Sequence, residues 1–382
     1  MSIPLTVLQG FVRWLDFMGL TTLVGALAFR CLIVRPPLLS RQEFDGFDRS
    51  CWSVVAGSIV LMALTSVGDL ALRTVMMSGR ALADLGLALP VVLRQTHYGA
   101  VWIARISLIG LLTMAWVLRT RGAPGLTWPL AASFVGATLI ALTTSLSGHA
   151  ADWGDVTLPV LIDWLHLLAV STWIGGLFTL GFVLHHSLLS PDKAEPTQSL
   201  ASIAGRFSTM AACCVAVFLP AGLYNAWLQV TSLSPLVSTS YGWTLLAKLS
   251  LVGLVLMIAA LNRYYFVPLL GRRPGTHDWL MFRMIGRLAN SPMMEMKPRD
   301  DERNRYQFFR SVRLEWIIVV GALACTALLT QLPPARHIRS HQHREQHAIP
   351  RPPQGPATAK RVAGGEKALI EMNSSLFLER TQ

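Results

Sequence analysis

One short segment combines side chains that could bind a metal ion. Asp163 and His166 are three residues apart in LIDWLHLL, a spacing that places both on one face of a helix. His149, in the preceding SLSGHAADWGDVTLP, is separated from them by only a short loop. Imidazole suits divalent first-row metals such as copper, zinc, iron and nickel. These three residues predict a metal site, although Asp163 could instead only orient His166, and His149 could cap a loop.

A second set of candidate ligands lies earlier in the chain. Met76 and Met77 come between Asp69 and His97, and thioethers select Cu(I) over harder ions. A further group of methionines occurs in the basic stretch 268–311, where an amphipathic helix at the membrane surface is the favoured explanation. The tail segment RHIRSHQHREQH could collect a metal ion or could be a solvated coil.

Seven ionisable residues occur where the surrounding sequence is apolar. Besides the candidate ligands Asp69, Asp163 and His166, these are Arg13, Asp16, Arg105 and Lys248. A charge in such a position costs about 2.5–3.5 kcal/mol on insertion into a membrane, so each needs a partner or a role. Arg13 and Asp16 share one helical face and could pair, while Arg105 and Lys248 could neutralise carboxylates. Two interpretations stay open: these residues line a transport path, or they form an ion-pair network that joins helices.

The elements that hold these residues must be membrane helices. The 382 residues are 52% hydrophobic and only 14% charged, and the mean hydropathy is +0.46. Soluble domains contain roughly 25% charged residues, so this composition excludes a water-soluble globular protein and a disordered one. We attribute the net charge of +12 to the loops of a membrane protein and expect no nucleic-acid partner. Five scattered cysteines without a CxxC or CxxCH argue against disulfides and c-type haem attachment.

The sequence predicts an all-α, polytopic membrane helix bundle. About 20 apolar residues cross a bilayer as a helix. Eight segments qualify, near 5–34, 51–73, 97–119, 128–147, 159–189, 206–230, 241–267 and 312–332. We expect residues 1–332 to form the transmembrane domain, with the first segment retained as a helix. Residues 333–382 form a polar, His-containing tail that we expect to be disordered.

The loop charges predict an orientation. Lys and Arg are concentrated in the loops that follow the first, third, fifth and seventh segments, which places these loops in the cytoplasm. Eight segments then leave both termini in the periplasm, and the candidate metal ligands near the periplasmic face.

Other local patterns concern packing and chemistry. Gly175 and Gly176 predict a close helix–helix contact, and Pro220 with Gly222 predicts a break in the middle of the sixth segment. The sequence contains no P-loop, GxSxG or HExxH motif and no dinucleotide-binding fingerprint, so we expect no enzyme activity and no ATP-driven transport.

Taken together, these motifs resemble those of the copper resistance protein D (CopD/PcoD) family of bacterial inner-membrane proteins. The matching elements include SGHA, DWLHLLAVSTWIGGL, AGLYNA, YGWTLLAKL, LNR and RSVRLEW. The resemblance implies a protein that moves copper, as Cu(I) or Cu(II), inward from the periplasm. It also implies a separate periplasmic copper-binding partner of the CopC type, beside the membrane lipid that surrounds the helices. The chain departs from the family pattern at Pro220 and in its long basic stretch.

Three functions follow from these observations. The first is copper transport across the inner membrane, with capture at His149, Asp163 and His166. The second is a cytochrome b-like electron carrier, in which histidines such as His97 and His166 ligate haem. The third is a copper-dependent assembly factor without net transport.

Overall fold

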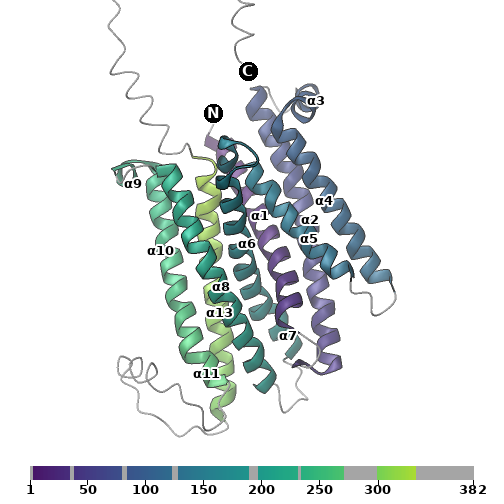
Figure 1. Cartoon of the computed structure of the whole chain (residues 1–382), viewed down its shortest axis with the longest axis vertical. Helices are drawn as coiled ribbons and strands as arrows, with labels where there is room; N and C mark the ends of the chain where they lie inside the picture. Colours follow the sequence, from purple (N-terminus) through teal and green to yellow (C-terminus); the bar gives the residue numbers. More distant parts are fainter. Residues whose placement is uncertain are drawn as a thin grey trace, which may run out of the picture. The chain divides into compact units, whose positions relative to one another are not determined.

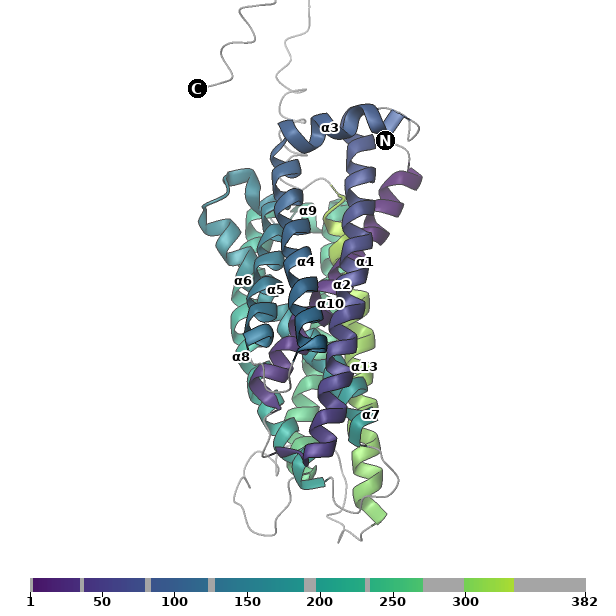
Figure 2. The same cartoon turned by 90° about the vertical axis from the view of Figure 1, so that its right-hand side faces the viewer.

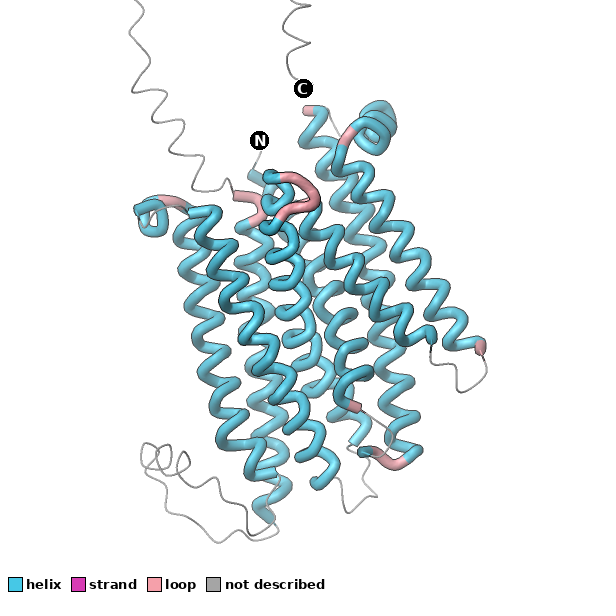
Figure 3. The backbone as a smooth tube through the Cα atoms, in the orientation of Figure 1, coloured by secondary structure: helices cyan, strands magenta, loops and turns pink. Residues whose placement is uncertain are grey.

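A computed structural model describes residues 3–34, 38–79, 84–122, 128–188, 197–230, 234–270 and 299–332. These ranges contain helices and connecting turns but no strand (Figure 3). Among them, eight helices are long and apolar enough to cross a membrane. The predicted all-α polytopic bundle is therefore confirmed. The predicted tail and most of the methionine-rich basic stretch lie outside the described residues.

The eight long helices follow one another along the chain with short elements between them. The long helices are α1 (Ile3–Ala28), α2 (Arg41–Ser78), α4 (His97–Arg121), α5 (Trp128–Leu146), α6 (Leu158–Phe178), α8 (Thr197–Val230), α10 (Ser240–Leu261) and α13 (Arg299–Leu329). Three of them continue as π-helical turns: η1 (Phe29–Ile33) after α1, η5 (Thr179–Leu184) after α6 and η6 (Asn262–Phe266) after α10. The short elements are α3 (Leu85–Gln95), η4 (His149–Trp153), α7 (His185–Leu188), α9 (Ser234–Ser238) and α11 (Val267–Leu270).

Several helix ends are specified by local sequence. Ser40 and Glu43 form a capping box at the start of α2, and Gly79 ends this helix with a left-handed φ of 64°. The Thr96 hydroxyl accepts a hydrogen bond from the backbone N–H of Gly99 and caps α4. The Thr239 hydroxyl accepts one from that of Gly242 and caps α10; both distances are 3.0 Å. These caps fix where the two helices that carry Arg105 and Lys248 begin.

The helices α1 and α6 occupy the centre of the bundle, and their apolar windows are 72% and 67% buried. In Figures 1 and 2, α2, α4 and α5 lie on one side of this central pair, and α8, α10 and α13 lie on the other. We call the end of the bundle where α1 begins and α13 ends the upper end, and the opposite end the lower end (Figure 1). The short elements α3, η4 and α9 lie at the upper end, and α7 and α11 at the lower end.

Glycine brings the two central helices into direct contact, as the sequence predicted for Gly175 and Gly176. A Cβ atom on Gly175 would lie 2.0 Å from the carbonyl oxygen of Thr21, and one on Gly25 would lie 2.2 Å from the Cα of Gly175. A Cβ on Gly176 would lie 2.6 Å from the ring of Phe207 on α8. No side chain fits at Gly25 or Gly175, so the backbones of α1 and α6 touch.

The structure corrects three predicted boundaries and one predicted break. The helices α2, α8 and α13 begin at Arg41, Thr197 and Arg299, well before the apolar segments that predicted them. Polar first turns continue a helix that hydropathy alone does not detect. The predicted break at Pro220 is wrong, since α8 runs without interruption from Thr197 to Val230. A membrane helix tolerates an internal proline because neighbouring groups satisfy the backbone that the ring leaves unpaired.

Candidate functional site

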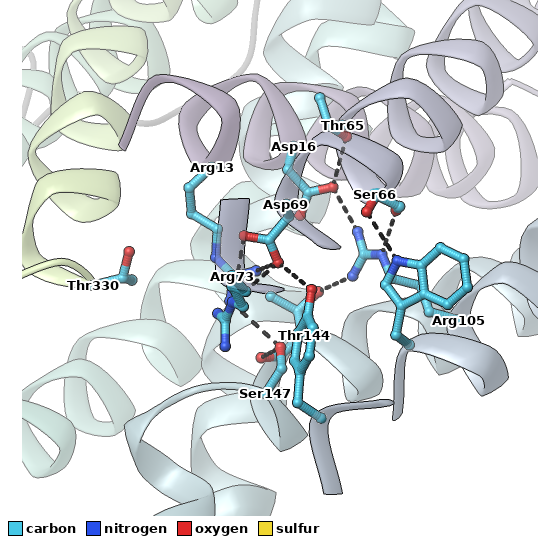
Figure 4. A network of polar contacts seen from close by, with 12 residues as sticks. Arg13, Asp16, Thr65, Ser66, Asp69, Arg73, Arg105, Thr144, Ser147 and Thr330 are labelled. Carbon is cyan, nitrogen blue, oxygen red and sulfur yellow. Dashed lines mark hydrogen bonds and ion pairs between the residues drawn. The ribbon is translucent and has the colours of Figure 1, made fainter. Parts of the chain in front are cut away.

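A buried ion-pair network joins α1, α2, α4 and α5 near the upper end (Figure 4). Asp16 accepts a hydrogen bond from the Arg105 guanidinium at 2.7 Å and another from the Thr65 hydroxyl at 3.1 Å. The same guanidinium donates to Thr144 at 2.8 Å and to Ser66 at 3.1 Å. The Arg105 and Asp16 side chains are each 8% exposed. The pair is therefore neutralised and hydrogen-bonded, as buried charges must be.

Asp69 is the second anion of this network. It accepts a hydrogen bond from the Tyr98 hydroxyl at 2.8 Å and forms an ion pair with Arg73, one turn along α2, at 3.2 Å. Arg13 approaches Asp69 at 3.8 Å and the Ser147 hydroxyl at 3.5 Å. Asp69 was a possible metal ligand on sequence grounds, and the structure surrounds it with cations and a phenol.

The predicted pair between Arg13 and Asp16 does not form, although the two residues share a face of α1. Arg105 from α4 forms an ion pair with the carboxylate of Asp16, while Arg13 pairs with Asp69 of α2. A helical spacing of three permits a pair, but here residues from neighbouring helices offer closer partners.

A small cavity lies within this network. Its volume is about 20 Å³, and its lining includes Arg13, Asp16, Asp69, Tyr98 and Arg105. A cavity of this size holds about one water molecule and has no room for a hydrated metal ion. The geometry favours the second interpretation of these residues, in which the network fixes four helices relative to one another.

A second polar cluster lies on the other side of α1, between α6, α8 and α10. Asp163 on α6 accepts a hydrogen bond from the Asn225 amide of α8 at 2.9 Å. Lys248 on α10 lies close enough to Asp163 for the two charges to interact. Both Asp163 and Lys248 are half-buried. This cluster places a carboxylate, an amide and an ammonium group at one depth in the bundle.

His166 belongs to the same cluster and has a defined orientation. Its Nδ1 lies 2.9 Å from the carbonyl oxygen of Phe218 on α8. A carbonyl can only accept, so Nδ1 carries the proton and the neutral ring keeps a lone pair on Nε2. Metal-binding histidines commonly have this arrangement, in which a backbone carbonyl fixes the tautomer.

Gly222 allows the imidazole to reach this position. A Cβ atom on Gly222 would lie 2.8 Å from Cε1 and 3.2 Å from Nδ1 of His166. The Phe218 ring meets the imidazole edge-on, with 6.2 Å between the ring centroids. The α8 segment around Phe218 and Gly222 therefore forms one wall against which His166 is held.

The predicted ligand triple is not assembled. His149 lies in η4, where its Nδ1 is 3.7 Å from the carboxylate of Asp152. Asp163 and His166 face α8 through Asn225 and Phe218. Among the residues that the structure describes, no three His, Cys, Asp or Glu side chains lie close enough to share a metal ion. A short loop allows residues to approach, but η4 packs as its own turn on α5 and α6 and pairs His149 locally.

The remaining candidate ligands are separate from this cluster. His97, at the start of α4, is exposed, and its Nε2 lies 2.9 Å from the Asp155 carboxylate. Met76 and Met77 lie in the last turn of α2, where Met77 is exposed. The additional methionines of the basic stretch and the tail histidines lie outside the described residues.

Sequence analysis missed a buried carboxyl group at the lower half of the bundle. Glu315 on α13 is 2% exposed, and its Oε1 accepts a hydrogen bond from the amide of Asn262 in η6. The predicted eighth segment began at residue 312, which placed Glu315 next to a loop. Helix α13 begins at Arg299 and its apolar span at Glu302, so Glu315 is inside the span.

Sequence comparisons place the chain among known proteins. Residues 4–158 match the profile of the copper resistance protein D-like N-terminal domain, and residues 201–329 match that of copper resistance protein D. Copper resistance protein D of Pseudomonas syringae pv. tomato is 32% identical over 289 residues, which cover 70% of this chain and 84% of that relative.

Two further relatives match at lower identity. Copper transport protein CutJ of Bacillus subtilis is 26% identical over 288 residues, which cover 73% of this chain and 45% of CutJ. Inner membrane protein YebZ of Escherichia coli is 27% identical over 243 residues, which cover 63% of this chain and 70% of YebZ. The chain thus spans less than half the length of CutJ, and no solved structure matches it.

The eight membrane helices and the relatives agree on a multi-pass inner-membrane protein with a copper-related function. The two profiles together match most of the chain, on both sides of the cluster at Asp163 and His166. The chain belongs to the copper resistance protein D family.

Proposed function

We propose that this protein moves copper across the bacterial inner membrane, inward from the periplasm, with His166 as the capture ligand. The observation that carries the proposal is the His166 imidazole, whose Nδ1 is held by the Phe218 carbonyl so that Nε2 keeps its lone pair. Asp163, one turn before it, supplies a carboxylate near the same depth. The printed names of two relatives, copper transport protein and copper resistance protein, supply the choice of metal.

The sparse ligand set supports movement of the ion better than storage. No three ligands converge on one point in the described part of the chain. Conduction requires a site that binds strongly enough to admit an ion and weakly enough to release it. In this proposal His149, at the surface turn η4, receives copper first and delivers it to His166 and Asp163.

The proposal includes an orientation and a partner. The upper end faces the periplasm, because loop Lys and Arg residues are concentrated at the lower end. Copper then reaches η4 and His166 from the periplasmic side, delivered by a separate copper-binding protein of the CopC type. The start of α1 and the end of α13 both lie on this side.

Transport by reconstituted protein tests the proposal. Vesicles that contain the purified protein and a trapped copper-sensitive dye should report copper entry. With the His166→Ala variant, copper should enter the vesicles at a rate at least about tenfold lower. Even the loss of a group that only orients a metal ligand lowers metal affinity or activity roughly 10–100-fold. His185→Ala, which removes a histidine at the lower end, is the matched control and should keep the wild-type rate.

Other outcomes would contradict this function. Equal rates for wild type and His166→Ala would remove His166 from the path. Wild-type vesicles without any dye response would favour an assembly factor without transport. A Soret absorption band in the purified protein, together with no copper entry, would favour the haem-binding electron carrier.

A further inference from the structure

Glu315 is a buried acid with no cation beside it. Its side chain lies inside the span of α13 and is 2% exposed. Within the described ranges, none of the ion pairs includes Glu315. An ionised carboxylate in this position has lost its water without gaining a counter-ion, which costs several kcal/mol, whereas a protonated one does not bear that cost.

The neighbouring cations are engaged elsewhere. Arg263, which follows Asn262 in η6, donates to the carbonyl and hydroxyl oxygens of Ser208 at 2.6 and 2.9 Å. Arg313, on α13 itself, donates to the carbonyl oxygen of Gly181 at 3.0 Å. These two are the nearest cations in sequence to the Glu315–Asn262 contact, and each faces a backbone oxygen.

In the part of the chain that the structure describes, the charged groups of the other elements do not pair with Glu315 either. Arg30 of η1 pairs with Asp48 at 2.6 Å, and Lys248 of α10 acts on Asp163. His185 of α7 packs edge-on against Phe309, and its burial together with Arg313 and Arg305 lowers its pKa to about 4, so it is neutral at pH 7. The charged residues of α1, Arg13 and Asp16, belong to the network at the upper end.

Asn262 contains a buried acceptor that a proton on Glu315 could satisfy. Its amide nitrogen donates to Oε1 of Glu315, while its own Oδ1 is buried and has no hydrogen-bond partner. Asn262 is itself only 7% exposed. A protonated carboxyl group can close a ring of two hydrogen bonds with an amide, because its O–H donates to the amide oxygen while its C=O accepts from the amide N–H. A proton on Glu315 would thus satisfy the one acceptor that an ionised carboxylate leaves unpaired.

The position of this pair suits a coupling role. Asn262 is the first residue of η6, and π-helical turns within helices are frequent at functional sites. Asn262 lies 14 residues after Lys248 of the copper cluster, which corresponds to about 21 Å along a continuous helix. The pair is therefore separate from the copper cluster, but Asn262 lies in η6, which continues the helix α10 that carries Lys248.

We propose that the Glu315–Asn262 pair is a proton-binding site that couples copper movement to proton movement across the membrane. The proton arrives from one aqueous side, resides on a carboxylate oxygen of Glu315 with Asn262 as its acceptor, and leaves to the other side. No oxidation or reduction is involved. This inference rests on the proposed transport of copper and supplies its energy source.

The test follows copper and protons in the same vesicles. Wild-type protein is reconstituted with a trapped copper-sensitive dye and a trapped pH-sensitive dye, and copper is added outside. We expect both dyes to respond in the wild type. In Glu315→Gln, which keeps the shape of the side chain but cannot release a proton, the copper-dependent pH change should fall to the level of protein-free vesicles. Glu302→Gln, an exposed glutamate on the same helix, is the control and should behave as wild type.

A second measurement does not depend on transport. The infrared difference spectrum between wild type and Glu315→Gln should contain the C=O band of a protonated carboxylic acid, and that between wild type and Glu302→Gln should lack it. Absence of the band from the Glu315→Gln difference would overturn the proton-binding site. Wild-type protein that moves copper with a silent pH dye would overturn the coupling alone, whereas wild-type protein that moves no copper would overturn the proposed function as well.

Discussion

At the scale of single residues, the buried ionisable groups differ in the partners that surround them. Asp16, Asp69, Arg13 and Arg105 neutralise one another across helices at the upper end. Glu315 has an amide as its hydrogen-bond partner and no cation. The first group has the geometry of a structural network, because its cavity has room for about one water molecule. The second is the group that we propose to bind a proton.

The ion pair between Asp16 and Arg105 should be essential for stability. Arg105→Met removes the cation and leaves Asp16 buried without its partner, which costs about 3–5 kcal/mol. Thermal unfolding in detergent should show this loss as a large drop in the midpoint. The double variant Asp16→Asn, Arg105→Met should be less destabilised than Arg105→Met alone, since no unpaired charge remains. A double variant that is as unstable as the sum of the single variants would contradict a direct pair.

Gly222 should determine the orientation of His166. In Gly222→Ala the added methyl group would lie 2.8 Å from Cε1 of the imidazole, so the ring must turn away from α8. We expect copper entry to fall by about as much as the loss of an orienting group costs, roughly 10–100-fold, with little change in the amount of folded protein. Gly205→Ala on the same helix meets no atom within 4 Å and is the control. An unchanged rate in Gly222→Ala would separate the ring position from transport.

Residue types identified the candidate groups, but not which of them meet. The pair of Asp163 and His166 follows from helical spacing, and both residues do belong to one polar cluster. Their contacts with Asn225 and Phe218 depend on the neighbouring helix, and no pattern in the sequence gives its rotation. His149 was placed near them because its loop is short. Loop length limits distance but not direction, and η4 turns His149 toward Asp152.

At the scale of elements, hydropathy located the eight spans and underestimated three helices. The run ahead of the last predicted segment, DDERNRYQFFR, is helical in α13, although most of its residues are charged or polar. This error is the reason that Glu315 escaped attention, since a carboxylate beside a loop needs no partner. The Gly175–Gly176 pair was interpretable in advance because a close helix contact needs a missing side chain. Its partner, Gly25, could not be identified without the packing of α1 on α6.

The contact between α1 and α6 should be intolerant of any added atom. Gly175→Ala would place a methyl group 2.0 Å from the backbone oxygen of Thr21, which cannot move as a flexible side chain could. Overpacking of this kind costs about 1–3 kcal/mol or more, so the unfolding midpoint in detergent should fall clearly. Gly253→Ala, in α10, meets no atom within 4 Å and should leave the midpoint equal or higher, because alanine favours a helix. Equal midpoints for both variants would mean that the two central helices do not touch here.

At the scale of the whole molecule, the polar groups are distributed unevenly along the bundle. The two polar clusters lie near the upper end, and the Glu315–Asn262 pair lies below them. Eight spans leave both ends of the described bundle on one side, and η4 and the start of α6, which carry the proposed capture residues, lie near that side (Figure 1). Under the proposed function, whether copper enters the cell or leaves it depends on which end of the bundle faces the periplasm. The positive loops at the lower end argue that the upper end does.

Cysteine labelling decides this orientation. Val156, between η4 and α6 at the upper end, is fully exposed, and Gln42, in the first turn of α2 at the lower end, is also exposed. In a chain without its five native cysteines, Val156→Cys should react with a membrane-impermeant maleimide in spheroplasts of intact permeability. Gln42→Cys should react only after the membrane is opened, because the cytoplasm lies on its side. The reverse pattern would place His166 nearer the cytoplasm, and the same capture geometry would then serve copper export, with the imidazole loaded from inside the cell.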